Sequence, residues 1–348
     1  MKGADVAAVE LGLDTFGDIT VDESGERVSG AQAIRNLVAQ ATLADQVGVD
    51  FIGVGEHHRA EYSVSSPEIV LAAIAAKTER IRVGTAVTVL SSDDPVRVYE
   101  RFATLSAISN GRAEVILGRG SFTESFPLFG FNLSDYEALF EERLELFSLL
   151  RSEKPVTWQG TTRAALSQAD VFPKTEGGIR AWVGVGGSPE SVIRTARYGY
   201  GLMLAIIGGP AARFRPYVDL YHRAIGELGS QAQPIGIHSP GHIADTDEQA
   251  WEEAYPGFEA QNNSIGRDRG WPPYSRLRFQ QEVGPGGSIY AGSPETVARK
   301  IADTITTLGA GRFDLKYANG TLRHDKLMRS IELYGTTVIP MVREMLGE

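Results

Sequence analysis

The sequence predicts a single (β/α)8 TIM barrel with insertions in the loops that follow its strands. Apolar runs rich in Val, Ile and Ala alternate with amphipathic stretches almost from end to end, as expected of strands buried on both faces with helices between them. The chain has 348 residues, of which 42% are hydrophobic, enough for one such barrel and its core. No linker-like segment divides the chain, so residues 1–348 are expected to form one domain.

The first half of the chain is predicted to supply four strand–helix units. Ser66 can cap a helix that begins at Pro67, because proline fits the first helical turn, where its missing N–H costs no hydrogen bond. Pro95 opens the next helix in the same way, and Asn110-Gly111 ends it. The predicted strands are 6–14, 50–55, 81–90 and 113–118, the helices are 31–47, 67–77, 95–109 and 134–150, and a hairpin lies around 22–26.

The second half is predicted to supply the other four strands and two excursions from the barrel. A polar stretch over 155–175 favours a hairpin. The insertion 245–290 contains a helix and then a segment rich in Gly, Pro and aromatic residues, and its length makes it a candidate lid or substrate pocket. Its aromatic side chains could equally bury a subunit interface. The predicted strands are 179–185, 201–207, 235–244 and 313–318, and helices end near Tyr198, Leu228, Leu308 and Leu346.

Composition excludes several classes of chemistry and of partner. The chain has no cysteine, which excludes disulfides, thiolate nucleophiles, iron–sulfur clusters and Cys-ligated zinc, so redox chemistry requires a bound cofactor. Lys and Arg number 34 against 44 Asp and Glu, a net charge of −10 that disfavours nucleic-acid and anionic-membrane partners. Without a long apolar run or an apolar start, the sequence predicts a soluble, cytoplasmic protein.

Active sites of such barrels lie at the carboxyl ends of the strands, and Glu56, His57 and His58 end the second strand. Two histidines beside a carboxylate indicate a general base whose tautomer a neighbour fixes, or else metal ligands. Adjacent strand residues point to opposite sides, which disfavours one metal shared by this pair, and His238 and His242 would have to complete such a site. A purely structural histidine pair is the remaining alternative.

Glycine-rich turns after later strands suggest a phosphate site. Arg119 lies between two glycines, where the backbone can approach a ligand closely, and its guanidinium suits a phosphate or an anionic ring. The alternative is an ion pair with a carboxylate at the barrel rim. The turns after strands five and six lead into helices, whose free N–H groups favour phosphate, although tight turns also use glycine for geometry alone. The candidate contacts there are Gly186, Gly187, Ser188, Gly208 and Gly209.

The third predicted strand contains the run Gly84-Thr85-Ala86-Val87, whose side chains are small enough for a flat ring to lie against them. Small residues are equally common in ordinary barrel packing. The residue chemistry alone therefore leaves both interpretations open.

Together these segments resemble the bacterial luciferase-like flavin monooxygenases over most of the chain. The resemblance rests on the order and spacing of short motifs. The matching motifs are Asp50 to His58, Gly84 to Val87, Asp94 to Arg97, Ser109 to Arg112, Gly118 to Gly120, Val185 to Ser191 and Arg329 to Tyr334.

The resemblance implies an enzyme that binds reduced FMN, reacts it with dioxygen and oxygenates an aldehyde, alkane, sulfonate or similar small compound. It implies that His57 is the catalytic general base or acid and that Arg119 contacts the ribityl phosphate. The flavin ring would lie on Thr85, Ala86 and Val87, with a cis peptide bond between the last two. The other implied phosphate and ribityl contacts are Gly186, Gly187, Ser188, Gly208 and Gly209. Members of the family are commonly homodimers.

One position departs from the bioluminescent members. Gly118 stands where the luciferase α subunit has a reactive cysteine, so light emission is not implied. No nicotinamide-binding glycine fingerprint follows a strand, so a separate reductase is predicted to supply reduced FMN. The alternatives are a deazaflavin-dependent hydride-transfer enzyme, a non-catalytic flavin-binding protein and, more remotely, a metal-dependent hydrolase; no metal is predicted.

Overall fold

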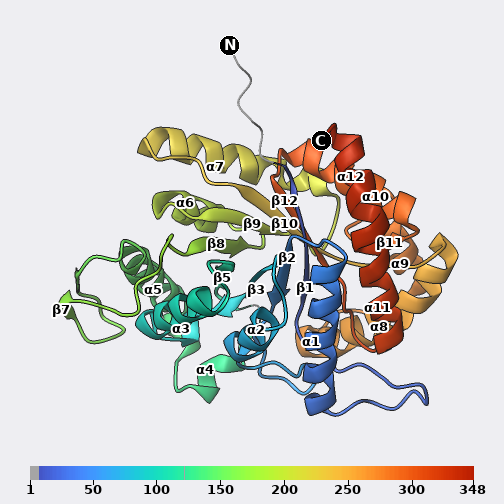
Figure 1. The fold of residues 1–348 in the computed structure, drawn as a ribbon, viewed down its shortest axis with the longest axis horizontal. Coiled ribbons are helices and arrows are strands. Elements are labelled where there is room, and N and C mark those ends of the chain that lie inside the picture. The colour runs from blue at the N-terminus through green and yellow to red at the C-terminus, as the bar shows by residue number, and fades with distance from the viewer. Residues whose placement is uncertain (1–7, 121) are drawn as a thin grey trace.

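Eight parallel strands close into a barrel in the computed structural model, which describes residues 8–120 and 122–348 (Figure 1). Each strand pairs with the next, and the eighth pairs with the first. This confirms the predicted (β/α)8 barrel. The barrel strands, in order, are β1 (Glu10–Thr15), β2 (Phe51–Val54), β3 (Arg82–Thr85), β5 (Ala113–Gly118), β8 (Arg180–Val185), β9 (Gly201–Ala205), β10 (Ile235–Ile243) and β12 (Arg312–Lys316).

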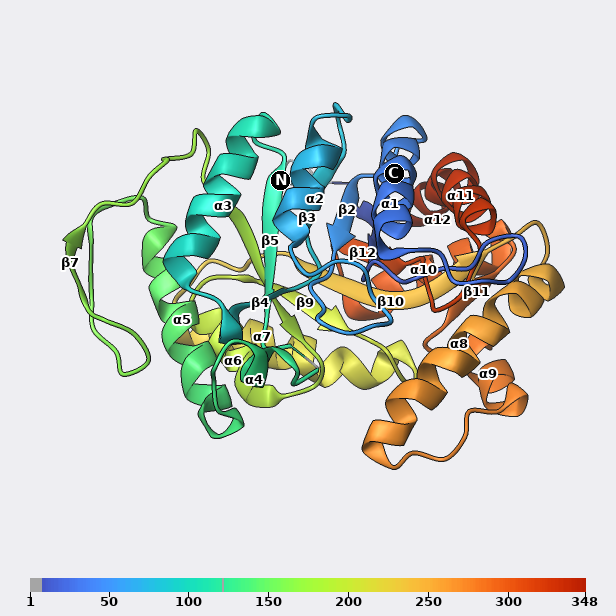
Figure 2. The ribbon, with the colours of Figure 1, turned by 90° about the horizontal axis from the view of Figure 1, so that it is seen from below.

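Helices cover the outside of the barrel, as Figures 1 and 2 show. The main core lies between them and the strands and is almost entirely aliphatic and aromatic. The helices are α1 (Gly30–Gln46), α2 (Pro67–Ala75), α3 (Pro95–Ile108), α4 (Ser125–Leu128), α5 (Tyr136–Leu150), α6 (Pro189–Arg197), α7 (Arg215–Leu228), α8 (Asp247–Arg269), α9 (Arg276–Val283), α10 (Pro294–Leu308), α11 (His324–Leu333) and α12 (Ile339–Leu346).

Local capping signals set several of these boundaries. The Asp94 carboxylate caps α3 by accepting hydrogen bonds from the backbone N–H groups of Val96 and Arg97, and Pro95 occupies the first turn as predicted. Ser66 does stand at the N-cap position of α2, but its side chain makes no capping hydrogen bond there. Proline at the first helical position therefore marks the start of α2 without help from the serine.

Two predicted strands differ from those observed. The run 81–90 is a strand only to Thr85, because a cis peptide bond between Ala86 and Val87 interrupts it before the short strand β4 (Thr88–Val89). The first strand begins at Glu10, and residues 8 and 9 are not part of it; residues 6 and 7 of that prediction lie outside the described residues. The predicted hairpin over 155–175 is present as β6 (Val156–Trp158) and β7 (Leu166–Ala169).

The insertion after β10 is more helical than predicted. It consists mainly of α8 and α9, followed by the short strand β11 (Tyr290–Gly292), which pairs with β10. The two helices share a small apolar core of their own, formed by Ala254, Phe258, Tyr274, Phe279, Val283, Ile289 and Ala291. Figure 2 shows α8 and α9 projecting to the same side of the barrel as α4, which follows the carboxyl end of β5.

The interior of the barrel near the amino ends of its strands is ionic rather than apolar. Arg312 is fully buried and contacts the carboxylates of Glu114 and Asp314, and its guanidinium lies 3.7 Å above the centre of the Phe51 ring. Phe51, Trp182, Met203 and Ile116 form the next layer. The partly exposed side chains of Ala86 and Val87 pack on that layer, so the cis peptide segment forms the floor of the barrel mouth.

Candidate active site

Glycines in neighbouring strands make room for this floor. A Cβ atom at Gly118 would lie 2.4 Å from Val87 Cγ2, and one at Gly184 would lie 3.3 Å from Val87 Cγ1. A Cβ at Gly53 would similarly lie 2.9 Å from Ala86 Cβ. The predicted cis bond between Ala86 and Val87 is therefore present in a segment that small neighbours fit closely. Its partly exposed apolar surface suits the face of a flat ring.

His57 lies at the mouth, just beyond β2, within an aromatic cluster. Its ring centroid is 4.4 Å from that of Tyr62, 4.6 Å from that of Phe16 and 5.3 Å from that of Phe122. Its backbone N–H donates to the carbonyl of Val64, which fixes the turn that presents the ring. The structure thus brings the predicted catalytic histidine to the carboxyl end of the barrel.

The aromatic surroundings keep His57 uncharged. Burial and, to a smaller extent, the nearby positive charge of Lys316 together lower the pKa of His57 to about 3. Lys316, at the end of β12, reaches this cluster, since its ammonium lies 4.7 Å from the centre of the Phe16 ring. At neutral pH the imidazole therefore has one nitrogen free to accept a proton.

The Glu56 carboxylate pairs with His58 and not with His57. The expectation that a sequence neighbour would fix the tautomer of the catalytic base is therefore not met for His57. Glu56 Oε1 lies 3.0 Å from His58 Nε2, and Glu56 Oε2 accepts a hydrogen bond from the backbone N–H of Val89. The Glu56–His58 pair thus ties the end of β2 to β4. It supports the floor segment from the side, and His57 alone of the two histidines joins the aromatic cluster.

A second histidine, His238, lies in the upper interior of the barrel. Its Nδ1 is 2.6 Å from the Asp14 carboxylate, and its ring stacks on Phe16, which also contacts His57, with 6.0 Å between centroids. Burial by itself would lower the pKa of His238, but the carboxylate of Asp14 outweighs burial and the pKa is raised. The sequence suggested His238 only as a member of a metal site, and the acid that pairs with it comes from a strand 224 residues away.

Arg119 extends from the carboxyl end of β5 and pairs with the carboxylate of Glu137 at the rim, which is the alternative that the sequence left open. Its guanidinium also lies 5.2 Å from the Tyr136 ring. About a quarter of the Arg119 side chain is exposed. The pKa of Glu190 is lowered mainly by hydrogen bonds that its carboxylate accepts from its own backbone and from Ser188, and the charge of Arg119 adds a smaller effect in the same direction. Arg119 therefore lies near the glycine turn after β8.

The two glycine turns lie next to each other, after β8 and β9. Gly187 and Gly209 have positive φ angles of 123° and 76°, and no atom would approach a Cβ at Gly186 or Gly208 within 4 Å, so their backbone is open to a ligand. Ser188 caps α6 through its hydroxyl, which accepts from the backbone N–H of Ser191. These turns have the open backbone and helix start that a phosphate requires.

Two further side chains join these turns and were not predicted. The Tyr217 hydroxyl of α7 donates to the carbonyl of Gly187 at 2.8 Å, and the exposed Arg213 lies against Gly209, with Nη1 2.7 Å from where a Cβ would be. Arg213 and Tyr217 follow Gly209 by one and two helical turns in the sequence, and this spacing was the only indication that they lie near the glycine turns. The candidate phosphate turns therefore have two arginines near them, Arg119 and Arg213.

The alternative of a metal site finds no support in the described part of the chain. No group of three or more His, Asp or Glu side chains there could hold a metal ion. His242, which the sequence considered as a ligand, is fully buried and pairs with Glu253 of α8 at 2.8 Å. Its role is to attach the insertion to β10.

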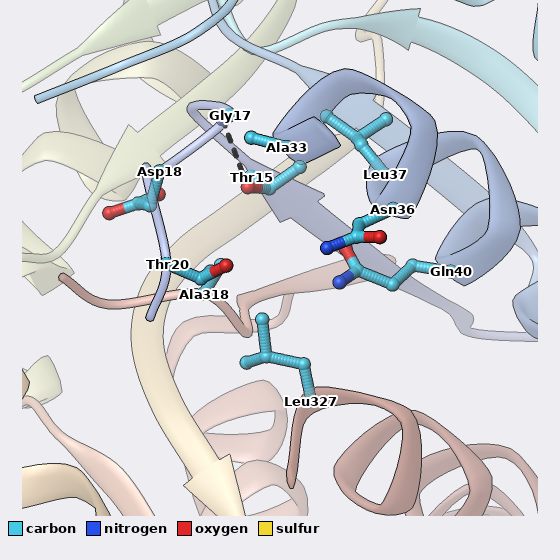
Figure 3. Close-up of a pocket in the computed structure, with 10 residues that line it drawn as sticks. All are labelled: Thr15, Gly17, Asp18, Thr20, Ala33, Asn36, Leu37, Gln40, Ala318 and Leu327. Carbon is cyan, nitrogen blue, oxygen red and sulfur yellow. Dashed lines mark hydrogen bonds between the residues drawn. The ribbon is translucent and has the colours of Figure 1, made fainter. Parts of the chain in front are cut away.

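A small cavity beside the mouth also has a structural explanation. It measures about 10 Å³, room for about one water molecule, and lies between β1, α1 and α11. Figure 3 shows Asn36 and Gln40 of α1 facing Leu327 of α11 across it. The buried Thr20 hydroxyl, which also lines it, has no protein partner within the described residues, so this space suits a bound water and not a substrate.

The site therefore has two ends. His57 lies beside β1 and β2, whereas the glycine turns follow β8 and β9, on the far side of the eight-stranded barrel. The floor formed by Ala86 and Val87 lies between them, next to β2 and β5. These residues fit a flavin with its ring on the floor and its phosphate at the glycine turns.

Comparison with known proteins agrees with this geometry. A sequence model described as luciferase-like monooxygenase matches residues 15–312. The chain is 27% identical, over 86% of its own length and 84% of the relative's, to 4-hydroxyprotoasukamycin monooxygenase of Streptomyces nodosus subsp. asukaensis. The matched residues 15–312 include both His57 and the glycine turns after β8 and β9.

Solved structures show the same fold. A monooxygenase from Streptomyces bottropensis superposes with a TM-score of 0.82 at 23% identity, covering 95% of this chain and 99% of that one. The oxygenating constituent of 3,6-diketocamphane monooxygenase from Pseudomonas putida, in complex with FMN, gives 0.75 at 20% identity, covering 96% and 98%. An F420-dependent secondary alcohol dehydrogenase gives 0.73 at 17% identity, covering 96% and 99%. Since the family match spans most of the chain, this protein belongs to the luciferase-like monooxygenases, a family of flavin-dependent oxidoreductases.

Proposed function

We propose that the protein uses reduced FMN and dioxygen to oxygenate a small organic substrate. The observation that carries the proposal is the placement of an uncharged, partly buried His57 across the barrel mouth from two open glycine turns. That arrangement suits a cofactor with a phosphate at one end and a reacting ring at the other. Bound reduced flavin would supply the electrons that activate dioxygen.

The roles of the residues follow from their positions. Ala86 and Val87 would support one face of the flavin ring, and Thr85 would hold the strand end below them, since its hydroxyl accepts a hydrogen bond from Thr88. The phosphate and ribityl chain would be bound at the other end. The residues proposed for that end are Arg119, Gly186, Gly187, Ser188, Gly208 and Gly209.

His57 would hold or accept a proton at its free ring nitrogen. An imidazole with a strongly lowered pKa stays neutral until negative charge develops beside it, because the new charge raises the pKa again. The aromatic cluster around His57 would also keep water from that position. His57 is therefore proposed to protonate and deprotonate in step with the reaction.

The test is an anaerobic titration of the protein with reduced FMN, reduced riboflavin and reduced F420, each followed by admission of labelled dioxygen. We expect reduced FMN to bind more tightly than reduced riboflavin, because riboflavin lacks the phosphate. Arg119→Gln should weaken binding of reduced FMN and so bring its dissociation constant closer to that of riboflavin. Label should appear in an organic product. Failure to bind any reduced flavin would refute the proposal.

The alternative is hydride transfer with a deazaflavin, and an F420-dependent enzyme indeed shares the fold. Preference for F420 together with indifference to oxygen would favour that alternative. Tight FMN binding without labelled product, unchanged by loss of His57, would instead favour a flavin-binding protein. The separate reductase, the homodimer and the cytoplasmic location stay predictions. The reductase rests on the lack of a nicotinamide-binding fingerprint, the homodimer on the family resemblance and the location on the lack of an apolar segment in the sequence.

A further inference from the structure

A second, larger cavity lies beside the His57 cluster, between α8 and the loops that follow β1, β2 and β12. Its volume is about 320 Å³, at the lower end of the roughly 300–1,000 Å³ typical of small-molecule sites. Much of its wall is apolar. The apolar lining residues are Ile19, Ala60, Tyr62, Ala260 and Ile265.

Tyr62 connects this cavity to the candidate catalytic residue. Tyr62 lines the cavity, and its ring stacks on His57 with 4.4 Å between centroids. The side chain is held in place by Gln261 of α8, whose amide donates to the Tyr62 hydroxyl at 3.0 Å. A molecule in the cavity would thus lie one aromatic ring away from the imidazole.

Among the described residues that line it, the cavity has three arginines and two carboxylates, although the chain as a whole is acidic. Its two carboxylates already have cationic partners: Asp18 lies 3.4 Å from Lys316, and Glu61 lies 3.4 Å from Arg59 and accepts a hydrogen bond from Ser264. Neither Asp18 nor Glu61 pairs with the two other arginines that line the cavity.

Those two arginines are Arg27 and Arg267, which line the cavity from different elements. Arg27 comes from the hairpin after β1 and donates to a neutral group, the carbonyl of Ala60, at 2.9 Å. Arg267 comes from the last turn of α8, and both side chains are exposed to solvent. A guanidinium at each side of a partly apolar cavity suits one anionic group at the end of an apolar body.

The phosphate of the cofactor does not account for this positive charge. The cavity lies next to β1, β2 and β12, whereas the proposed phosphate turns follow β8 and β9 across the barrel. Arg119 and Arg213 already lie near those turns. The charge in the cavity is therefore available to a second ligand.

We propose that this cavity binds the substrate and that the substrate is a small organic acid. Its apolar body would contact Ile19, Tyr62 and Ile265, and its anionic group would lie between Arg27 and Arg267. This inference rests on the proposed oxygenase function for its meaning, but binding of the acid does not require flavin.

The test is isothermal titration calorimetry of the full chain, without flavin, with octanoate, octan-1-ol and octylammonium as probes of equal chain length. We expect octanoate to bind about tenfold more tightly than octan-1-ol, and octylammonium not to bind. Arg27→Gln and Arg267→Gln should each weaken octanoate about fivefold and leave octan-1-ol unchanged. Arg299→Gln, an exposed arginine of α10 outside the cavity, is the matched control and should change nothing.

A steric variant tests the location. Ala260→Trp should abolish octanoate binding and preserve FMN binding, because it fills the cavity and leaves the glycine turns untouched. Equal affinity for octanoate and octan-1-ol, insensitivity to both arginine variants, or displacement of octanoate by inorganic phosphate would overturn the inference. The proposed function fails separately, when reduced flavin does not bind.

Discussion

The charge of His57 is decided by its neighbours in space. Three aromatic rings surround the imidazole, and none of them belongs to the Glu56-His57-His58 motif that drew attention to it. The sequence could place His57 at a strand end because the strand was recognisable. It could not show the lowered pKa, because Phe16 and Phe122 lie in the segments after β1 and β5 and meet His57 only when the barrel closes.

Replacing His57 by Gln should lower turnover by about 10² to 10⁴, the usual contribution of a general acid or base. Binding of reduced FMN should be kept, since the glycine turns lie across the barrel from this residue. The measurement is kcat for labelled product beside the dissociation constant of reduced FMN. Equal loss in His222→Gln, an exposed histidine of α7, would show that the effect is not specific to the site.

The pKa of His57 also predicts how stability depends on pH. The pKa is about 3 in the folded protein and about 6.5 in the unfolded chain, so between these values the unfolded state binds more protons. His57 therefore destabilises the fold progressively as pH falls below about 6.5, with each pKa unit of separation worth about 1.4 kcal/mol. His57→Phe should flatten the acid side of the stability curve.

Urea unfolding of wild type and His57→Phe between pH 7 and pH 4 would measure the difference. His222→Phe serves as control, because an exposed histidine has no comparable burial to lose. Parallel curves for wild type and His57→Phe would contradict the assigned pKa. His238 acts with the opposite sign, since its pKa is raised and the stability it contributes is lost as pH rises through that value.

At the scale of single elements, the end of β5 shows what Gly118 contributes to packing, at the position where the resemblance predicts a departure from the luciferase α subunit. Gly118 leaves the space that the Val87 side chain occupies, with a Cβ falling 2.4 Å from Val87 Cγ2. Any side chain at this position must displace the floor of the mouth. Gly118 thus allows β5 to pack closely against the segment after β3.

Gly118→Ala should therefore lower stability by about 1–3 kcal/mol, the usual cost of overpacking a core, and weaken FMN binding. Gly184→Ala is the graded control, because its Cβ would lie 3.3 Å from Val87 Cγ1 and needs a smaller shift. Thermal unfolding and flavin titration measure both effects. A Gly118→Ala protein with unchanged stability and affinity would show that Val87 moves freely.

Element boundaries were predictable where local signals act, and the insertion was not. Pro95, Asp94 and the glycine after α10 mark helix ends through hydrogen bonds within a few residues. In the insertion, Pro256 and the glycines predicted a loop, yet α8 continues through Pro256. Packing of Ala254 and Phe258 against α9 stabilises that helix, and such contacts have no local signature.

For the whole molecule, the buried ionic layer is the feature that the apolar pattern of the strands concealed. Glu114 interrupts an otherwise apolar strand, and that was its only signal in the sequence. In the structure it is fully buried and contacts Arg312, Arg82 and Arg180, which join β12, β3 and β8. Burial opposes its charge, but the three arginines outweigh burial and lower the pKa of Glu114.

Removing that carboxylate should be costly. Glu114→Ala leaves Arg312 buried with one partner fewer, and we expect a loss of about 3–5 kcal/mol in the free energy of unfolding. Glu100→Ala breaks an exposed pair with Arg97 and should change stability by less than about 1 kcal/mol. Denaturant titration compares the two variants. Similar small losses in both would mean that the ionic layer contributes little to closing the barrel.

The separation of the two ends of the site has an evolutionary consequence. The floor, the glycine turns and His57 belong to the strands and the turns directly after them, whereas one wall of the larger cavity is α8, which has its own small core and reaches the β2 loop through single hydrogen bonds such as that of Gln261 with Tyr62. Substitutions in α8 that keep Gln261 would therefore leave the proposed flavin site and His57 undisturbed. With the substrate in that cavity, as proposed, a lineage of such barrels would acquire new substrates by altering one helix.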